Sequence, residues 1–237
     1  MTTISLLSLL AVALGATVQG SIGFGMAMVA APVLLLLDPR LVPGPLLCAV
    51  FCVTLLMTRR EWRNVTPSAI GWMVTGGIPG SALGAWATVA LAPNVLGAAL
   101  GLLVVCGVIM SALGHCLRLS RPTLIGTGVV SGVMGTVLSM GGPPLALLYQ
   151  NQPGGELRGT LAGYFTVATP VALTALFLVG NMGWVELRLA APLIPAALLG
   201  YVASGRIAPR LNKQMTRKAV LMLAGLAGVA VVFRHWW

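Results

Sequence analysis

GSIGFG, at residues 20–25, and SMGGPP, at residues 139–144, each interrupt a long apolar segment, one in each half of the chain. Glycine and proline at this density end a helix. In a membrane, non-helical backbone is tolerated only where protein buries it or where it lines a wet cavity. Broken helices at corresponding places in two halves of a chain are typical of a transporter binding site.

The composition around these breaks is that of a membrane protein. Hydrophobic residues make up 58% of the 237 residues and charged residues only 8%. Apolar stretches of about 18–25 residues alternate with short loops, which is typical of a polytopic α-helical membrane protein. The net charge of +10 comes from basic residues in those loops. There they orient the chain in the lipid bilayer, so the charge does not indicate nucleic-acid binding.

Eight segments are expected along the chain. The breaks divide the first, residues 4–37, and the fifth, residues 123–149. Uninterrupted helices are expected at 41–58, 69–91, 95–115, 159–179, 187–205 and 219–233.

The two halves resemble each other at a single offset of 116 residues. The matching positions are Gly25 with Gly141, Ile78-Pro79 with Ile194-Pro195, Gly84 with Gly200, and Ala92-Pro93 with Ala208-Pro209. Four matches in one register, two of them dipeptides, indicate an internal repeat. The predicted repeats are residues 1–118 and residues 119–237.

The positions of lysine and arginine predict how the segments cross the membrane. If every segment crossed, the fourteen basic residues would divide evenly between the two faces. If both broken segments enter and leave on one side, eleven fall on one face and only Arg40, Arg188 and Arg234 on the other. Such a bias marks the cytoplasmic face. The same count would result if the segment at 187–205 were the non-crossing one in place of 123–149. The glycine and proline content favours 123–149 as the segment that does not cross.

These observations predict an all-α polytopic membrane protein made of two inverted repeats. Each repeat is expected to be a re-entrant glycine-broken hairpin plus three transmembrane helices. With six crossings in all, both termini are expected outside the cytoplasm. Inverted repeats whose broken helices meet at the midplane of the bilayer are a secondary-transporter architecture.

The second arm of each hairpin begins at its break, and a helix N-terminus carries free N–H groups and a partial positive charge. Two such ends that converge would form an anion site from backbone alone. Glycines let a ligand approach closely, and nearby polar side chains add donors. The predicted substrate-binding residues are Gln19, Ser21, Gly23, Gly25, Ser139, Gly141, Gly142 and Pro143.

Two arginines follow the hairpins, Arg40 after the first and Arg158 after the second. In the predicted topology they lie on opposite faces, where they would gate or steer an anion. The alternative is an interfacial arginine that extends its charge toward water.

Residues typical of other functions are missing from the sequence. All four acidic residues lie at segment ends or in loops, whereas proton-driven carriers often hold a carboxylate within a span. The sequence contains no metal-ligand cluster and no phosphate-binding loop. We therefore expect no enzyme activity, no metal and no cofactor.

Three stretches resemble the TauE/SafE family of sulfite and organosulfonate exporters: GFG at 23–25 with Pro32 after it, MGGPP at 140–144, and IPGSALG at 78–84. The resemblance extends over nearly the whole chain. It implies export of sulfur-containing anions, in agreement with an anion site at the two breaks.

The leading hypothesis is thus a secondary transporter of the bacterial inner membrane that exports sulfite or a short organosulfonate. The alternative is an anion channel of similar architecture. A small anion and the lipid bilayer are the expected partners, and assembly into a homo-oligomer is left open.

Overall fold

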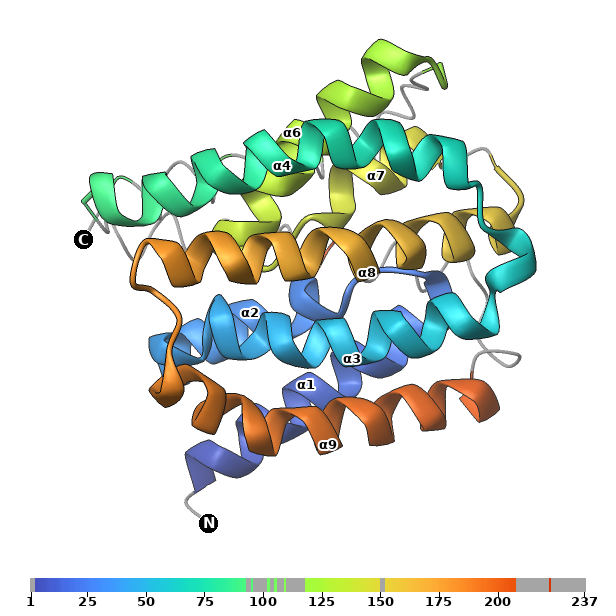
Figure 1. Ribbon diagram of the computed structural model, residues 1–237. Helices are drawn as coiled ribbons and strands as arrows, with labels where there is room; N and C mark the ends of the chain where they lie inside the picture. Colours follow the sequence, from blue (N-terminus) through green and yellow to red (C-terminus); the bar gives the residue numbers. More distant parts are fainter. Residues whose placement is uncertain are drawn as a thin grey trace.

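The computed structural model describes residues 3–92, 118–149 and 152–207, together with single positions at 95, 102, 105, 109 and 222. Within these ranges the elements are all helical (Figure 1), which confirms the predicted all-α class. They are α1 (Thr3–Ile22), α2 (Met26–Leu37), η1 (Pro39–Leu41), α3 (Gly44–Arg60), η2 (Trp62–Asn64), α4 (Pro67–Ala90), α6 (Arg121–Leu138), α7 (Gly142–Tyr149), α8 (Gly154–Leu178) and α9 (Trp184–Ile207). The helices expected at 95–115 and 219–233 lie outside the described ranges, apart from those single positions.

Both predicted breaks are present. The first separates α1 from α2 and the second separates α6 from α7. Gly23 and Gly25 have φ angles of 102° and 115°, a left-handed conformation that glycine adopts without penalty. Ser139 reaches φ 62° in the second break although it carries a side chain. Gly141 and Gly142 do not share this conformation, so a positive φ is not the reason for glycine there.

The uninterrupted helices agree with the predicted segments within five residues. The largest difference is at α8, which begins at Gly154 rather than at 159. Pro153 precedes its first turn, and a helix can extend past the apolar region when its first residues face water. At α3 the chain first makes the short η1 turn, where the Asp38 side chain accepts from the backbone N–H of Arg40. This turn delays the start of α3 to Gly44.

Three helices in the described part of the chain are long and apolar enough to cross a membrane, at Pro39–Arg60, Gly154–Leu178 and Trp184–Arg206. Large apolar side chains are exposed on the outside of the bundle, among them Leu14 at 62% and Leu199 at 71%. An apolar outer surface is unfavourable in water and favourable in lipid. The protein is therefore a polytopic helical membrane protein.

Close pairs of helices organise the bundle. In Figure 1, α3 and α8 lie between α4 on one side and α9 on the other. The end of α3 lies beside the start of α8, because Arg158 of α8 donates to Glu61, which follows α3. Farther into the bundle the Thr58 and Thr166 hydroxyls are 2.9 Å apart. The central pair is therefore antiparallel.

Glycines bring two other pairs of helices into contact. On α4, Gly76, Gly80 and Gly84 lie against Ile125, Val129 and Val133 of α6, so these two helices run parallel. On the other side α1 runs parallel to α9. There Gly200 lies against Ala13, and Gly20 lies against Ser204. Contact of this kind through small residues is a common way for membrane helices to pack.

Candidate functional site

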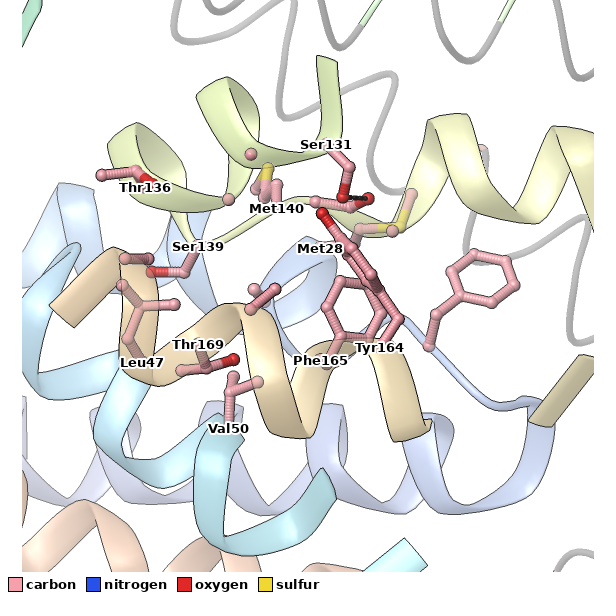
Figure 2. A pocket seen from close by; sticks show the side chains of 18 of the residues that line it. Met28, Leu47, Val50, Ser131, Thr136, Ser139, Met140, Tyr164, Phe165 and Thr169 are labelled. Carbon is pink, nitrogen blue, oxygen red and sulfur yellow. Dashed lines mark hydrogen bonds between the residues drawn. The ribbon is translucent and has the colours of Figure 1, made fainter. Parts of the chain in front are cut away.

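A cavity of about 540 Å³, including its open side, lies between the two breaks. The first half of the chain borders it with the end of α1, the first break, the start of α2, and residues of α3 and α4. The second half borders it with the end of α6, the second break and the middle of α8. Figure 2 shows Thr136, Ser139 and Leu47 toward one end of the cavity, and Tyr164 and Phe165 toward the other.

The two breaks touch each other in this cavity. A Cβ atom built on Gly142 would lie 3.2 Å from Cδ2 of Phe24, so the backbone of the second break packs directly on the ring of the first. Ser131 of α6 donates to the Gly141 carbonyl at 2.8 Å, and Ser139 donates to the Pro43 carbonyl at 3.1 Å. These two hydroxyls hold the non-helical backbone of the second break in place.

Five of the eight predicted substrate-binding residues line the cavity: Gln19, Gly25, Ser139, Gly141 and Gly142.

The other three predicted residues lie close by but face other neighbours. The Ser21 hydroxyl donates to the Thr17 carbonyl within α1, at 2.7 Å. A Cβ atom on Gly23 would lie 3.0 Å from Cα of Arg158, so this glycine allows close packing against α8. Pro143 is buried in the first turn of α7.

The two predicted steering arginines do not line the cavity, and each is bound to a carboxylate. Arg40 contacts both carboxylate oxygens of Asp38 at 3.0 Å, with its side chain 75% exposed. The Arg40 hydrogen bond holds the pKa of Asp38 below its ordinary value, against the opposing effect of burial. Arg158 donates through Nε to Oε1 of Glu61 at 3.2 Å and is mostly buried.

Glu61 links several charged groups at the end of α3. Burial raises the pKa of its carboxyl group, but hydrogen bonds from Arg158 and Asn64 and the charges of Arg158 and Arg60 outweigh that effect, so the pKa is lowered. Arg60 also donates to the Gly20 carbonyl at 2.8 Å and lies over the Tyr201 ring. This cluster connects α1, α3, α8 and α9 beside the first break.

Gln19 occupies a special position at the start of α2. Its Oε1 accepts from the backbone N–H of Met26, the first residue of α2, at 3.2 Å. Its Nε2 is buried and has no hydrogen-bond partner. The amide therefore presents unused N–H groups next to the N-terminus of a helix.

Several polar residues of the cavity lie outside the predicted set. They are Ser81 of α4, Ser131 and Thr136 of α6, and Tyr164 and Thr169 of α8. Thr136 is fully buried, and its hydroxyl has no partner. The available signal was the presence of hydroxyl residues just before the second break, in an otherwise apolar segment. The predicted set took its polar side chains only from residues within or directly beside the breaks, so it did not include these hydroxyls.

The cavity can therefore bind a ligand rich in hydrogen-bond acceptors. Its described lining contains neither an acidic nor a basic side chain, so the donors are neutral. Among the described residues, no group of three His, Cys, Asp or Glu side chains is placed to hold a metal ion.

Comparison with known proteins identifies the family of this chain. The family model for the sulfite exporter TauE/SafE matches residues 7–231, nearly the whole chain and both breaks. No curated protein and no solved structure matches the chain. Because the match covers nearly the whole chain, including both breaks, the chain belongs to the TauE/SafE sulfite exporter family.

Proposed function

We propose that this protein is a secondary transporter that exports a small sulfur-containing anion, sulfite or a short organosulfonate, from the bacterial cytoplasm. Membership of a sulfite exporter family supports transport of this class. The observation that carries the proposal is the cavity between the two breaks, in which the buried Gln19 amide presents free N–H groups. Such a site offers hydrogen bonds to the oxygens of an anion.

Two helix N-termini at the cavity add to these donors. Residues at the start of α2, Ala27 and Met28, line the cavity, and so does Gly142 at the start of α7. Each N-terminus carries about half an elementary positive charge. Together they can balance one negative charge without a buried lysine or arginine.

We further propose that the fold consists of two inverted repeats and that the site lies near the middle of the membrane. The ends of α1 and α6 are 116 residues apart, and so are the starts of α2 and α7. The packing of the helices is also reciprocal. The first arm of each hairpin runs parallel to a long helix of the other half, α1 to α9 and α6 to α4. Both features are expected of two related halves that face opposite sides of the membrane.

Arg40 and Arg158 keep a proposed role in steering anions toward the site. Charges near an entrance raise the association rate more than the final affinity, and salt screens the effect. Their carboxylate partners reduce the charge that each presents, so the expected effect is modest.

Transport can be tested with the full-length chain in proteoliposomes. Vesicles loaded with unlabelled sulfite should accumulate labelled sulfite by counterflow, and the flux should saturate. A chloride-loaded control reports leakage. Currents without exchange would instead indicate a channel, and absence of any sulfur-anion flux would contradict the proposed function.

A further inference from the structure

Two buried polar groups that line the cavity lack a hydrogen-bond partner: Nε2 of Gln19 and Oγ1 of Thr136. The side chains are 3% and 0% exposed. A buried polar group without a partner costs about 1–3 kcal/mol, and such groups are rare in folded proteins. Two of them on one cavity, one from each half of the chain, indicate that a ligand supplies the missing partners.

The free end of the Gln19 amide is a donor. Met26 N–H points at the other end of the amide, 3.2 Å from Oε1. The reversed orientation would set this N–H against the NH₂ group and lose the hydrogen bond. The NH₂ group is therefore the end without a partner, and its two protons can bind ligand oxygens.

Two other hydroxyls on the cavity have already donated their single proton. Ser131 donates to the Gly141 carbonyl and Ser139 to the Pro43 carbonyl. These oxygens offer only lone pairs to a ligand. The Gln19 amide and the Thr136 hydroxyl keep their protons available.

The cavity also lacks a charge that could balance a doubly charged ligand. Its described lining is neutral. Two cations lie beside the first break: Arg60, which donates to the Gly20 carbonyl, and Arg158, which donates to Glu61. Neither lines the cavity, and Glu61 offsets part of their charge. Burying a charge without a counter-charge is very costly, so the two helix N-termini suffice for one negative charge only.

We propose that the cavity selects singly charged oxyanions over doubly charged ones, and that Gln19 Nε2 and Thr136 Oγ1 donate hydrogen bonds to the bound anion. This inference rests on the proposed function and specifies its substrate class. The remaining walls include Met28, Leu47, Met140 and Phe165, which suit the apolar part of an alkanesulfonate. For sulfite, the bound species is hydrogensulfite, the singly charged form.

Charge selectivity can be measured on the full-length wild-type protein by titration calorimetry. Methanesulfonate carries one charge and sulfate two throughout the neutral pH range. Sulfate should bind at least about 100-fold more weakly. Above the pH at which hydrogensulfite loses its proton to become doubly charged sulfite, the apparent affinity for total sulfite should fall about tenfold for each further pH unit. Methanesulfonate does not titrate there, so its affinity should stay constant, which controls for titration of the protein.

Substitutions test the two donors. Thr136→Val removes the hydroxyl while keeping the shape. Gln19→Glu keeps the acceptor for Met26 but replaces the NH₂ group with oxygen and, when ionised, adds a negative charge. Thr136→Val should weaken methanesulfonate binding by about 10- to 100-fold, the usual range for a hydrogen bond to a charged group, and Gln19→Glu by at least as much. Without ligand, Thr136→Val should be as thermally stable as the wild type or more so, because an unsatisfied group has been removed.

Thr127→Val is the matched control. Thr127 is also a buried threonine of α6, but its hydroxyl donates to the Thr123 carbonyl and it does not line the cavity. Normal binding in the Thr136 variant, or equal affinity for sulfate and methanesulfonate, would overturn the inference and leave the transport proposal standing. If no sulfur oxyanion binds at any pH, the proposed function fails as well. The wild-type comparison decides selectivity even if a variant does not fold.

Discussion

At the scale of single residues, contact between Gly142 and Phe24 joins the two breaks. A Cβ atom at position 142 would lie 3.2 Å from the aromatic ring, so even the smallest side chain would make Phe24 give way by a few tenths of an ångström. Glycine at this position thus serves close approach rather than backbone conformation, since its φ angle is not positive. A side chain here would push apart the two pieces of backbone that border the cavity.

Gly142→Val should therefore reduce sulfite flux by at least tenfold, a loss on the order of 1.4 kcal/mol or more, while the protein still folds into the membrane. The added methyl groups would displace Phe24 and enter the cavity. Flux in proteoliposomes and thermal stability in detergent are the two measurements. Gly126→Val is the control, because a Cβ atom at Gly126 of α6 would meet nothing within 4 Å. Normal flux in the Gly142 variant would show that the contact between the breaks is not part of the site.

Glu61 should make the stability of the protein depend on pH. Its pKa is lowered from the ordinary value of 4.5, so the folded state stabilises the charged carboxylate. This stabilisation of the folded protein is complete at pH values above 4.5 and is lost as the pH falls through the lower, folded-state pKa. Wild type should therefore melt higher than Glu61→Gln at pH 7, and the difference should vanish in acid.

Asp38→Asn serves as the comparison for this pH profile. The Asp38–Arg40 pair is more exposed, so water and salt screen it and its loss should change the melting temperature less. A pH-independent difference between wild type and Glu61→Gln would contradict the role of the carboxylate.

At the scale of helices, small residues decide how closely α4 and α6 pack. Gly80 of α4 lies against the Val129 carbonyl, and a Cβ atom there would also come within 2.9 Å of Cα of Val129. Because backbone rather than a flexible side chain is the neighbour, the helices would have to separate. The contact positions α6, and with it the second break.

Gly80→Ala should lower the free energy of unfolding by about 1–3 kcal/mol, a typical cost of overpacking. Gly71→Ala, on the same helix but with open space around its Cβ position, should raise it by about 0.5–1 kcal/mol because alanine favours helix. Denaturant unfolding in mixed micelles measures both. Equal effects of the two substitutions would show that close packing at Gly80 does not stabilise the pair.

The helices and their breaks could be predicted because each depends on local chemistry. Apolar length marks a helix in a membrane, and clustered glycine and proline end it. Helix partners could not be predicted, because apolar composition does not reveal that α1 packs on α9. The same limit applied at the site. Gln19 was marked by its polarity beside a break, whereas the free hydroxyl of Thr136 becomes evident only once its neighbours are placed.

At the scale of the whole molecule, each hairpin returns to the end where it began. Gly44, at the start of α3, packs against Met182, just before α9, and α1 runs parallel to α9. The first hairpin therefore begins and ends beside the start of α3. The second begins beside the start of α4 and leads to the start of α8, at the opposite end of the bundle. The second arm, α2, has 12 residues and is about 18 Å long, too short to cross a hydrocarbon core of about 30 Å, whereas α1 with its 20 residues is long enough to do so.

This arrangement makes a definite prediction for the orientation of the protein in the cell. The turn after α3 contains Arg63, and Arg59 and Arg60 at the end of α3 bring the number of basic residues there to three, so it should face the cytoplasm. The turn between α8 and α9 contains Asn181 and should face outward. In a variant without native cysteines, Arg63→Cys should be labelled by an impermeant maleimide only after cells are opened. Asn181→Cys should be labelled in intact cells; both side chains are exposed. Helix α8 begins beside the turn after α3, where Arg158 contacts Glu61, and ends just before Asn181. Labelling of both positions from the same side would therefore contradict a crossing by α8, and with it the proposed inverted topology.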